Sequence, residues 1–274
     1  MNNPKQESNQ LIFLKLGGSL ITDKNKPRTA QKAVLSQLAD EITAYQKKFP
    51  GVRLLIGHGS GSFGHHTARK HGTKQGVKTR DDWKGFWEVW SDARELHLLV
   101  LATFKSAGLR VLSFPPSSSL TAEDGKVVTW NTHPIQAALS SSLVPVVYGD
   151  TVFDLKIGGT ILSTEDLFIH LAGKLHPDKI FLAGKDPGVW ADYPDCTEVI
   201  ESITPLNAST FKGTLKPSES PDVTGGMAAK VAEMLKLVEG DPNLKVFIFQ
   251  ALEAGQLTEA LVTEKSGTLI TASD

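Results

Sequence analysis

Short hydrophobic runs alternate with longer amphipathic segments along most of the chain. Runs rich in Val, Ile and Leu predict buried strands, whereas apolar residues at helical spacing predict helices. Strands are predicted at residues 11–16, 52–56, 109–114, 144–148, 179–183, 245–249 and 267–271, with a β-hairpin at 150–162 around Gly158-Gly159. Helices are predicted at residues 29–48, 81–107, 135–142, 165–175 and 227–239, and one more begins at Gly64.

This alternation predicts an α/β fold with a mostly parallel central sheet covered by helices on both faces, a three-layer αβα sandwich. The polar residues 1–10 indicate a disordered N-terminal extension, and residues 11–274 indicate a single domain. Residues 205–225 are rich in Pro, Ser, Gly and Lys and are expected to form a mobile loop. Ligands of such sheets bind beyond the carboxyl ends of the strands, so the loops at that edge carry the candidate chemistry.

Composition narrows the class of protein. The 274 residues are 40% hydrophobic and 22% charged, which is ordinary for a folded protein with a full core. A net charge of −1 gives no reason to expect nucleic acid or a membrane as partner. The single cysteine, Cys196, excludes an internal disulfide and suits a reducing compartment. The N-terminus lacks the apolar stretch of a signal peptide, so a cytoplasmic location is expected.

Two glycine-rich loops follow predicted strands. The first is Lys15-Leu16-Gly17-Gly18-Ser19, and the second runs from Gly57 to His65 and contains Ser60, Gly61 and Gly64. Glycine removes the Cβ that would keep backbone N–H groups away from an anion, so both loops are typical of phosphate binding. Together they predict a protein that grips two phosphate groups at once.

Charged side chains in these loops suggest phosphoryl chemistry. Lys15 ends a hydrophobic strand, where an ammonium group needs a counter-charge, and it suits a clamp on phosphoryl oxygens. His65 closes the second loop at a predicted helix start, so its ring and the helix N-terminus converge on one phosphate. Lys24 follows the first loop and either reaches the same anion or is a solvated turn residue.

Three more segments lie where the predicted strands end or helices begin. Asp222 to Met227, with Gly225 and Gly226, precedes Lys230 and suits nucleotide phosphates or an ordinary capped helix. Glu165 and Asp166 start another helix, where they orient lysines, hold Mg²⁺, or merely complement the helix dipole. The third segment follows the strand at 179–183 and contains Asp186, Gly188, Val189 and Trp190.

An aromatic stripe lies on the long helix predicted at 81–107. Trp83, Phe86, Trp87 and Trp90 share one helical face by their spacing. Most such stripes belong to the core, but this one follows closely on the second glycine loop. It therefore also suits the wall of a pocket for an apolar substrate tail.

Taken together, these motifs resemble the amino acid kinase superfamily, and within it most closely the isopentenyl phosphate kinase family. The resemblance extends from about residue 11 to the end. It rests on a first motif, Lys15 to Lys24, and on five others: His58 to His65, Val144 to Asp150, Ile161-Leu162-Ser163, Asp222 to Lys230 and Gly267 to Ile270. It implies transfer of the γ-phosphoryl group of ATP, with Mg²⁺, to isopentenyl phosphate in isoprenoid biosynthesis, by an alternative mevalonate route.

The resemblance also implies roles for individual residues. Residues 11–160 would form the phosphate-acceptor half and residues 161–274 the ATP half of a homodimeric enzyme. The catalytic residues would be Lys15, Lys24, His65 and the carboxylates Glu165 and Asp166. The substrate would be bound by Ser60, Gly61, Gly64, His65, Gly159 and the aromatic stripe. ATP would be bound by Lys15, Gly17, Gly18, Ser19, Gly61, Asp186, Gly188, Val189, Trp190, Gly225, Gly226 and Lys230.

Two positions depart from the family pattern. Ser60 stands where glycine is usual, and Glu165 stands where aspartate is common. Two other functions stay open. A fosfomycin kinase-like enzyme shares the motif set, although a small polar phosphonate needs no wide apolar pocket. A catalytically silent nucleotide-binding protein has no need for Lys15, Lys24, His65 and Lys230 together.

Overall fold

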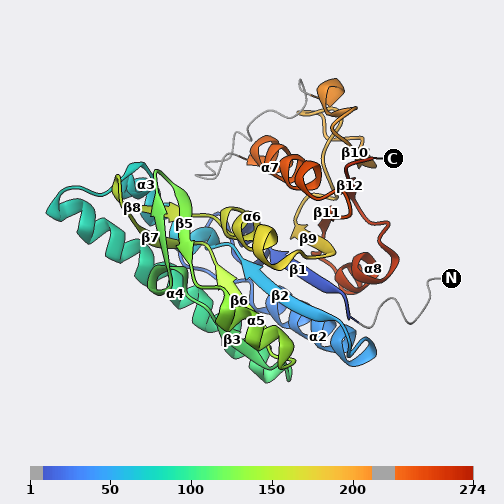
Figure 1. Ribbon diagram of the computed structural model, residues 1–274, viewed down its shortest axis with the longest axis horizontal. Helices are drawn as coiled ribbons and strands as arrows, with labels where there is room; N and C mark the ends of the chain where they lie inside the picture. Colours follow the sequence, from blue (N-terminus) through green and yellow to red (C-terminus); the bar gives the residue numbers. More distant parts are fainter. Residues whose placement is uncertain (1–8, 212–225, 274) are drawn as a thin grey trace.

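The computed structural model describes residues 9–211 and 226–273, and an eight-stranded sheet runs through them (Figure 1). From one edge to the other the strands are β10 (Ser202–Ile203), β12 (Thr268–Ile270), β11 (Lys245–Gln250), β9 (Lys179–Gly184), β1 (Leu11–Leu16), β2 (Arg53–His58), β6 (Val144–Tyr148) and β3 (Val111–Ser113). Neighbours pair in parallel except β11 and β12. The predicted mostly parallel sheet is confirmed.

Helices cover both faces of this sheet. One layer contains α2 (Lys32–Lys48), α4 (Arg80–Ser106) and α8 (Gln256–Thr263), and the other contains α5 (His133–Ser140), α6 (Thr164–Leu175) and α7 (Gly226–Gly240). Side chains of a strand alternate between faces, so even-numbered residues of β1 pack with α2 and α4. Leu11 and Phe13 face α6, where the Phe13 and Phe168 rings lie 5.1 Å apart. The three-layer α/β fold is confirmed.

The alternation along β1 also decides where Lys15 points. Lys15 continues the face of Leu11 and Phe13, at the carboxyl end of a strand with parallel neighbours on both sides. Its side chain is therefore directed to the layer formed by α6 and α7.

A second sheet, of four strands, was only partly predicted. Its order is β5 (Lys126–Trp130), β4 (Leu120–Glu123), β7 (Asp150–Asp154) and β8 (Gly158–Leu162). The hairpin at 150–162 is confirmed, but its turn lies at residues 155–157, before Gly158-Gly159. The hairpin of β4 and β5 was missed, although Asp124-Gly125 at its turn has the positive φ values that such pairs favour.

Other element boundaries also differ from the sequence predictions. Helix α3 (Gly61–His71) begins three residues before the predicted start at Gly64, so that start was wrong. Helix α2 begins at Lys32 rather than at residue 29, because Ala30 pairs with Thr22 in a β-bridge. Strand β3 is shorter than predicted. Four one-turn elements complete the described chain: α1 (Gly18–Ile21), η2 (Thr73–Gln75), η3 (Pro116–Ser118) and η4 (Ala208–Phe211).

Two predicted segments lie partly outside the described residues. Of the predicted N-terminal extension, residues 1–8 lie outside, whereas Gln10 is tied to β2 by the Arg53 N–H donating to its carbonyl (2.8 Å). Of the predicted mobile loop, residues 212–225 lie outside, and its described part includes η4. In the ranges 9–211 and 226–273 no helix is both long and apolar enough to cross a membrane.

Candidate functional site

The two glycine loops pack against each other at the carboxyl ends of β1 and β2. A Cβ on Gly18 would lie 2.5 Å from the backbone N of Gly61, and a Cβ on Gly59 would lie 2.8 Å from the N of Gly18. Side chains at these positions would force the loops apart. The glycines therefore bring the backbones of the two loops side by side. That these loops bind two phosphate groups stays a prediction.

Thr22 fastens the two loops together, and sequence reasoning missed it. Its buried hydroxyl donates to the carbonyl of Gly18 (2.6 Å) and accepts from the backbone N–H of Ser62 (3.0 Å). Gly61 has a φ of +49° and packs onto the same threonine. A lone threonine in a polar loop carries no distinguishing pattern, so no sequence signal could have found it.

Lys15, Glu165 and Lys230 form the ionic centre of the site. The Lys15 ammonium pairs directly with Glu165 Oε1, and Lys230 Nζ lies 3.8 Å from the same oxygen. Burial opposes ionisation of Glu165, but the charges of Lys15 and then Lys230 outweigh it and lower its pKa to about 2. One carboxylate thus orients two lysines that come from β1 and α7, far apart in sequence.

Asp166 has a different role from its neighbour. It accepts from the backbone N–H of Ser163 (2.7 Å) while its own N–H donates to the Ser163 hydroxyl (3.1 Å), which is a capping box at the start of α6. Of the alternatives left open for this carboxylate pair, the structure assigns the lysines to Glu165 and the helix start to Asp166.

Glu233 is a further carboxylate at this site that the sequence did not reveal. It lies one turn beyond Lys230 on α7 and is half-buried. Burial, followed by the charges of Asp166 and Glu165, raises its pKa to about 7, against the opposing influence of Lys74 and Lys15. Its spacing of three from Lys230 on one helix was the available sequence signal.

Two buried histidines, His58 of the second glycine loop and His97 of α4, pack against each other. His58 and His97 share a hydrogen bond between ring nitrogens (2.9 Å), and burial lowers the pKa of His58 to about 4. The carbonyl of His58 accepts from the Thr164 hydroxyl (2.7 Å), next to Glu165 in sequence. This contact joins the second glycine loop to the helix that carries Glu165.

His65 lies in the second turn of α3 rather than at the helix start and is half-buried. Ser60 is the residue before the helix, and a Cβ on Gly64 would lie 2.5 Å from the Ser60 hydroxyl. The serine that departs from the family pattern therefore occupies space left by Gly64.

Lys24 is exposed in a loop between α1 and α2. This Lys24 loop (residues 22–30) is closed by the Thr22–Ala30 bridge and by the Asp23 N–H donating to the carbonyl of Thr29 (2.9 Å). It is attached to α3 at Ser62, whose carbonyl accepts from the Arg28 N–H (3.2 Å).

The aromatic stripe divides between three environments. Trp83 and Phe86 form an aromatic cluster with Phe153 of β7, with ring centroids 5.2 to 5.9 Å apart. Phe86 also covers Gly159, where a Cβ would lie 2.9 Å from its ring. By contrast, Trp87 is 59% exposed and the Trp90 indole donates to the Ser117 hydroxyl (3.2 Å). The four residues do not share one surface, but Phe86 and Gly159 do lie together.

The loop after β9 lies at the same edge of the sheet. Asp186 is exposed, whereas Val189 is buried and its N–H donates to the Thr268 hydroxyl (2.8 Å). Val189 thus anchors this loop to β12. Gly226 starts α7 with a φ of +72°, and Gly225 lies outside the described residues.

No dedicated metal cage is built by the described side chains. Within residues 9–211 and 226–273 no group of three or more His, Cys, Asp or Glu is placed to hold a metal ion. Mg²⁺ in nucleotide sites is held largely by phosphates and water with one or two carboxylates, and Glu165 and Glu233 lie near the lysines. The donor set fits a metal that arrives with a nucleotide.

Comparison with known proteins confirms the resemblance drawn from the motifs. The model of the amino acid kinase family matches residues 10–250. An isopentenyl phosphate kinase of Methanocaldococcus jannaschii is 33% identical over 96% of this chain and all of the relative, and one of Haloferax volcanii is 34% identical over 87% and 94%. A solved isopentenyl phosphate kinase superposes with a TM-score of 0.79 and 27% identity, covering 95% of this chain and all of that one. The chain belongs to the amino acid kinase family.

Proposed function

We propose that this protein is an ATP-dependent kinase that phosphorylates isopentenyl phosphate to isopentenyl diphosphate. The observation that supports this most directly is the Lys15–Glu165–Lys230 array beside the paired glycine loops. Relatives that match this chain over nearly its whole length are isopentenyl phosphate kinases.

The reaction follows from charge neutralisation and positioning. Lys15 and Lys24 contact the γ-phosphate. ATP is cradled by the loop residues Gly17, Gly18, Ser19 and Gly61. His65 holds the acceptor phosphate. Lys230, the loop at residues 186–190 and the start of α7 hold the nucleotide. An acceptor oxygen attacks the γ-phosphorus in line as the bond to ADP breaks, so no covalent enzyme intermediate is needed. Bound Mg²⁺ would neutralise phosphate charge.

The two halves of the chain divide these tasks. Residues 11–160 contribute the acceptor phosphate site and the aromatic cluster, and residues 161–274 contribute most of the ATP site. The cluster of Trp83, Phe86 and Phe153 favours an apolar acceptor tail over a small polar phosphonate such as fosfomycin.

The first experiment is ADP release with Mg-ATP, comparing isopentenyl phosphate, fosfomycin and a sample without acceptor. We expect turnover that depends on isopentenyl phosphate. Turnover with fosfomycin alone would reassign the acceptor, and release with neither would support a silent nucleotide-binding protein.

In the same assay His65→Ala should lower kcat/KM at least ~100-fold, the scale for losing one charge-stabilising donor. Near-normal turnover in that variant would remove His65 from the mechanism.

We further propose a cytoplasmic homodimer without nucleic-acid or membrane partners. The single cysteine supports a reducing compartment. Strand β3 is an edge of the large sheet, and Leu112 on it and Leu98 on α4 are about half exposed. Sedimentation at about twice the chain mass of 29.6 kDa would support the dimer.

A further inference from the structure

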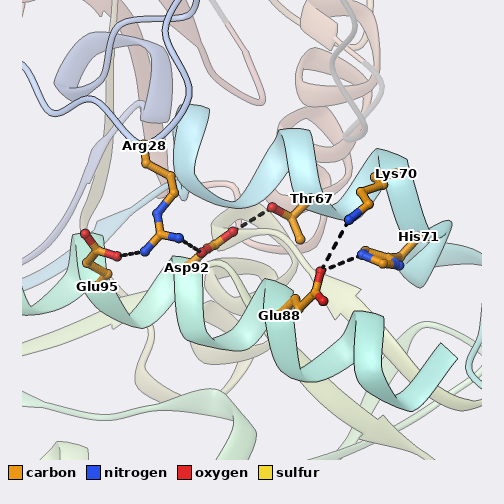
Figure 2. Close-up of polar contacts among 7 residues, drawn as sticks. All are labelled: Arg28, Thr67, Lys70, His71, Glu88, Asp92 and Glu95. Atoms are coloured by element: carbon orange, nitrogen blue, oxygen red, sulfur yellow. Dashed lines mark hydrogen bonds and ion pairs between the residues drawn. The ribbon is translucent and has the colours of Figure 1, made fainter. Parts of the chain in front are cut away.

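A polar network connects α3, α4 and the Lys24 loop (Figure 2). Asp92 of α4 lies at its centre and is only 7% exposed. One of its carboxylate oxygens lies 3.1 Å from the Arg28 guanidinium, and the other accepts from the Thr67 hydroxyl (2.6 Å). Arg28 is held from a second side by Glu95, one turn further along α4.

These two partners of Asp92 belong to segments that carry phosphate-binding candidates. Arg28 is in the Lys24 loop, four residues after Lys24. Thr67 is in α3, two residues after His65. Each oxygen of the Asp92 carboxylate thus contacts a segment that carries one of the two phosphate-binding candidates. Helix α4, which carries Asp92, contributes neither candidate.

The backbone of the Lys24 loop explains why this attachment matters. Arg28 has a φ of +52°, in the left-handed region, and its N–H donates to the carbonyl of Ser62 at the start of α3. A side chain in that conformation is strained and needs contacts that compensate. The Arg28 guanidinium supplies them, because its two charge-assisted contacts, one to Asp92 and one to Glu95, fix orientation as well as position.

We propose that Asp92 is a positioning residue: it fixes the Lys24 loop to the helix that carries His65, and so sets the distance between the two phosphates that react. The inference rests on the proposed roles of Lys24 and His65. Asp92 itself contacts neither ATP nor acceptor in this account. Its effect should appear in the rate of phosphoryl transfer, because small misplacements of positioned groups are costly in rate.

Helix α4 also offers a matched control. Glu88 joins α4 to α3 through His71 (2.7 Å) and Lys70 (3.7 Å) but contacts no residue of the Lys24 loop among those that Figure 2 draws (Figure 2). Removing the charge of Glu88 weakens the contact between the same two helices but leaves the contact between Asp92 and Arg28 in place. A general loosening of α3 against α4 would therefore be seen in both Glu88 and Asp92 variants.

The test compares Asp92→Asn, Arg28→Gln, their double variant and Glu88→Gln in the full-length protein. Asp92→Asn and Arg28→Gln should each lower kcat about tenfold with little change in KM, and the double variant should lose no more than the larger single loss. Glu88→Gln should keep kcat within about twofold. Arg28 is exposed, so its variant is expected to fold even if the buried Asp92 variant does not.

Hydrogen exchange provides a readout that does not depend on activity. Amides in residues 22–31, including those of Asp23 and Arg28, should exchange faster than in the wild type in Asp92→Asn and Arg28→Gln. In Glu88→Gln their exchange rates should be unchanged. Wild-type kcat and wild-type exchange in Arg28→Gln would overturn the inference while leaving the proposed function intact. If the wild-type protein itself transferred no phosphoryl group, the proposed function would fail, and the exchange data alone would decide whether Asp92 fixes the loop.

Discussion

Glu165 and Asp166 are adjacent in sequence yet serve different ends. Successive residues of a helix point about 100° apart, so only one of two neighbouring carboxylates can face the sheet. Glu165 faces Lys15, and Asp166 turns back to cap α6. The sequence identified the pair but could not choose between them, because the rotation of α6 about its axis is fixed by packing of Leu167, Phe168 and Leu171.

This division of roles predicts distinct outcomes for two conservative substitutions. Glu165→Gln removes the carboxylate charge that faces the buried Lys15 ammonium and should cost about 3 kcal/mol of unfolding free energy, together with most of kcat. Asp166→Asn weakens the cap of α6 and removes one of the charges that act on Glu233, and it should cost about 1 kcal/mol of unfolding free energy. Denaturant unfolding and steady-state kinetics on both variants would check this. Equal losses in the two variants would contradict the assignment of the lysines to Glu165.

At the scale of elements, hydrophobic periodicity located most strands and helices. It failed where tertiary contacts determine where an element begins or with which strand it pairs. Helix α3 starts at Gly61, although glycine and serine are poor helix formers. The buried ring of Phe63 and the contacts of Ser62 with the Lys24 loop stabilise its first turn instead. Strand β4 pairs with the distant β7 as well as with β5, a contact that no local pattern reveals.

Under the proposed function, we expect the face of α4 that meets β7 and β8 to select the acceptor. Phe86→Leu or Trp83→Ala should raise the ratio of kcat/KM for geranyl phosphate over isopentenyl phosphate by about tenfold, since space for a few methylenes changes discrimination on that scale. Trp87→Ala is the control, because Trp87 is exposed and outside the aromatic cluster. An unchanged ratio with normal folding would place the aromatic cluster in the core rather than in the acceptor pocket.

For the whole molecule, the carboxylates of the ionic site make the folding stability depend on pH. The pKa of Glu233 is raised from 4.5 to about 7, so the folded state binds more protons than the unfolded state between these values. Its contribution to stability is therefore lost as pH rises through that window. Glu165, whose pKa is lowered to about 2, contributes in the opposite sense, and its stabilisation is lost as pH falls below about 4.5.

Glu233→Gln should consequently raise the Tm of the nucleotide-free protein, and the gain should grow from about pH 5 to about pH 8. The control is Glu239→Gln, an exposed position on the same helix. Thermal melts at several pH values would measure both differences. A gain that is constant with pH, or equal in the two variants, would contradict the raised pKa of Glu233.

Strand β1 lies in the middle of the large sheet, paired with β2 on one side and with β9 on the other. During synthesis β2 follows soon after β1, but β9 ends only at Gly184. Until β9 has been made, a nascent chain therefore carries an open strand edge that is apolar except for Lys15. Open edges of this kind invite pairing with other chains. We therefore expect fragments of this chain that end before β9 to aggregate.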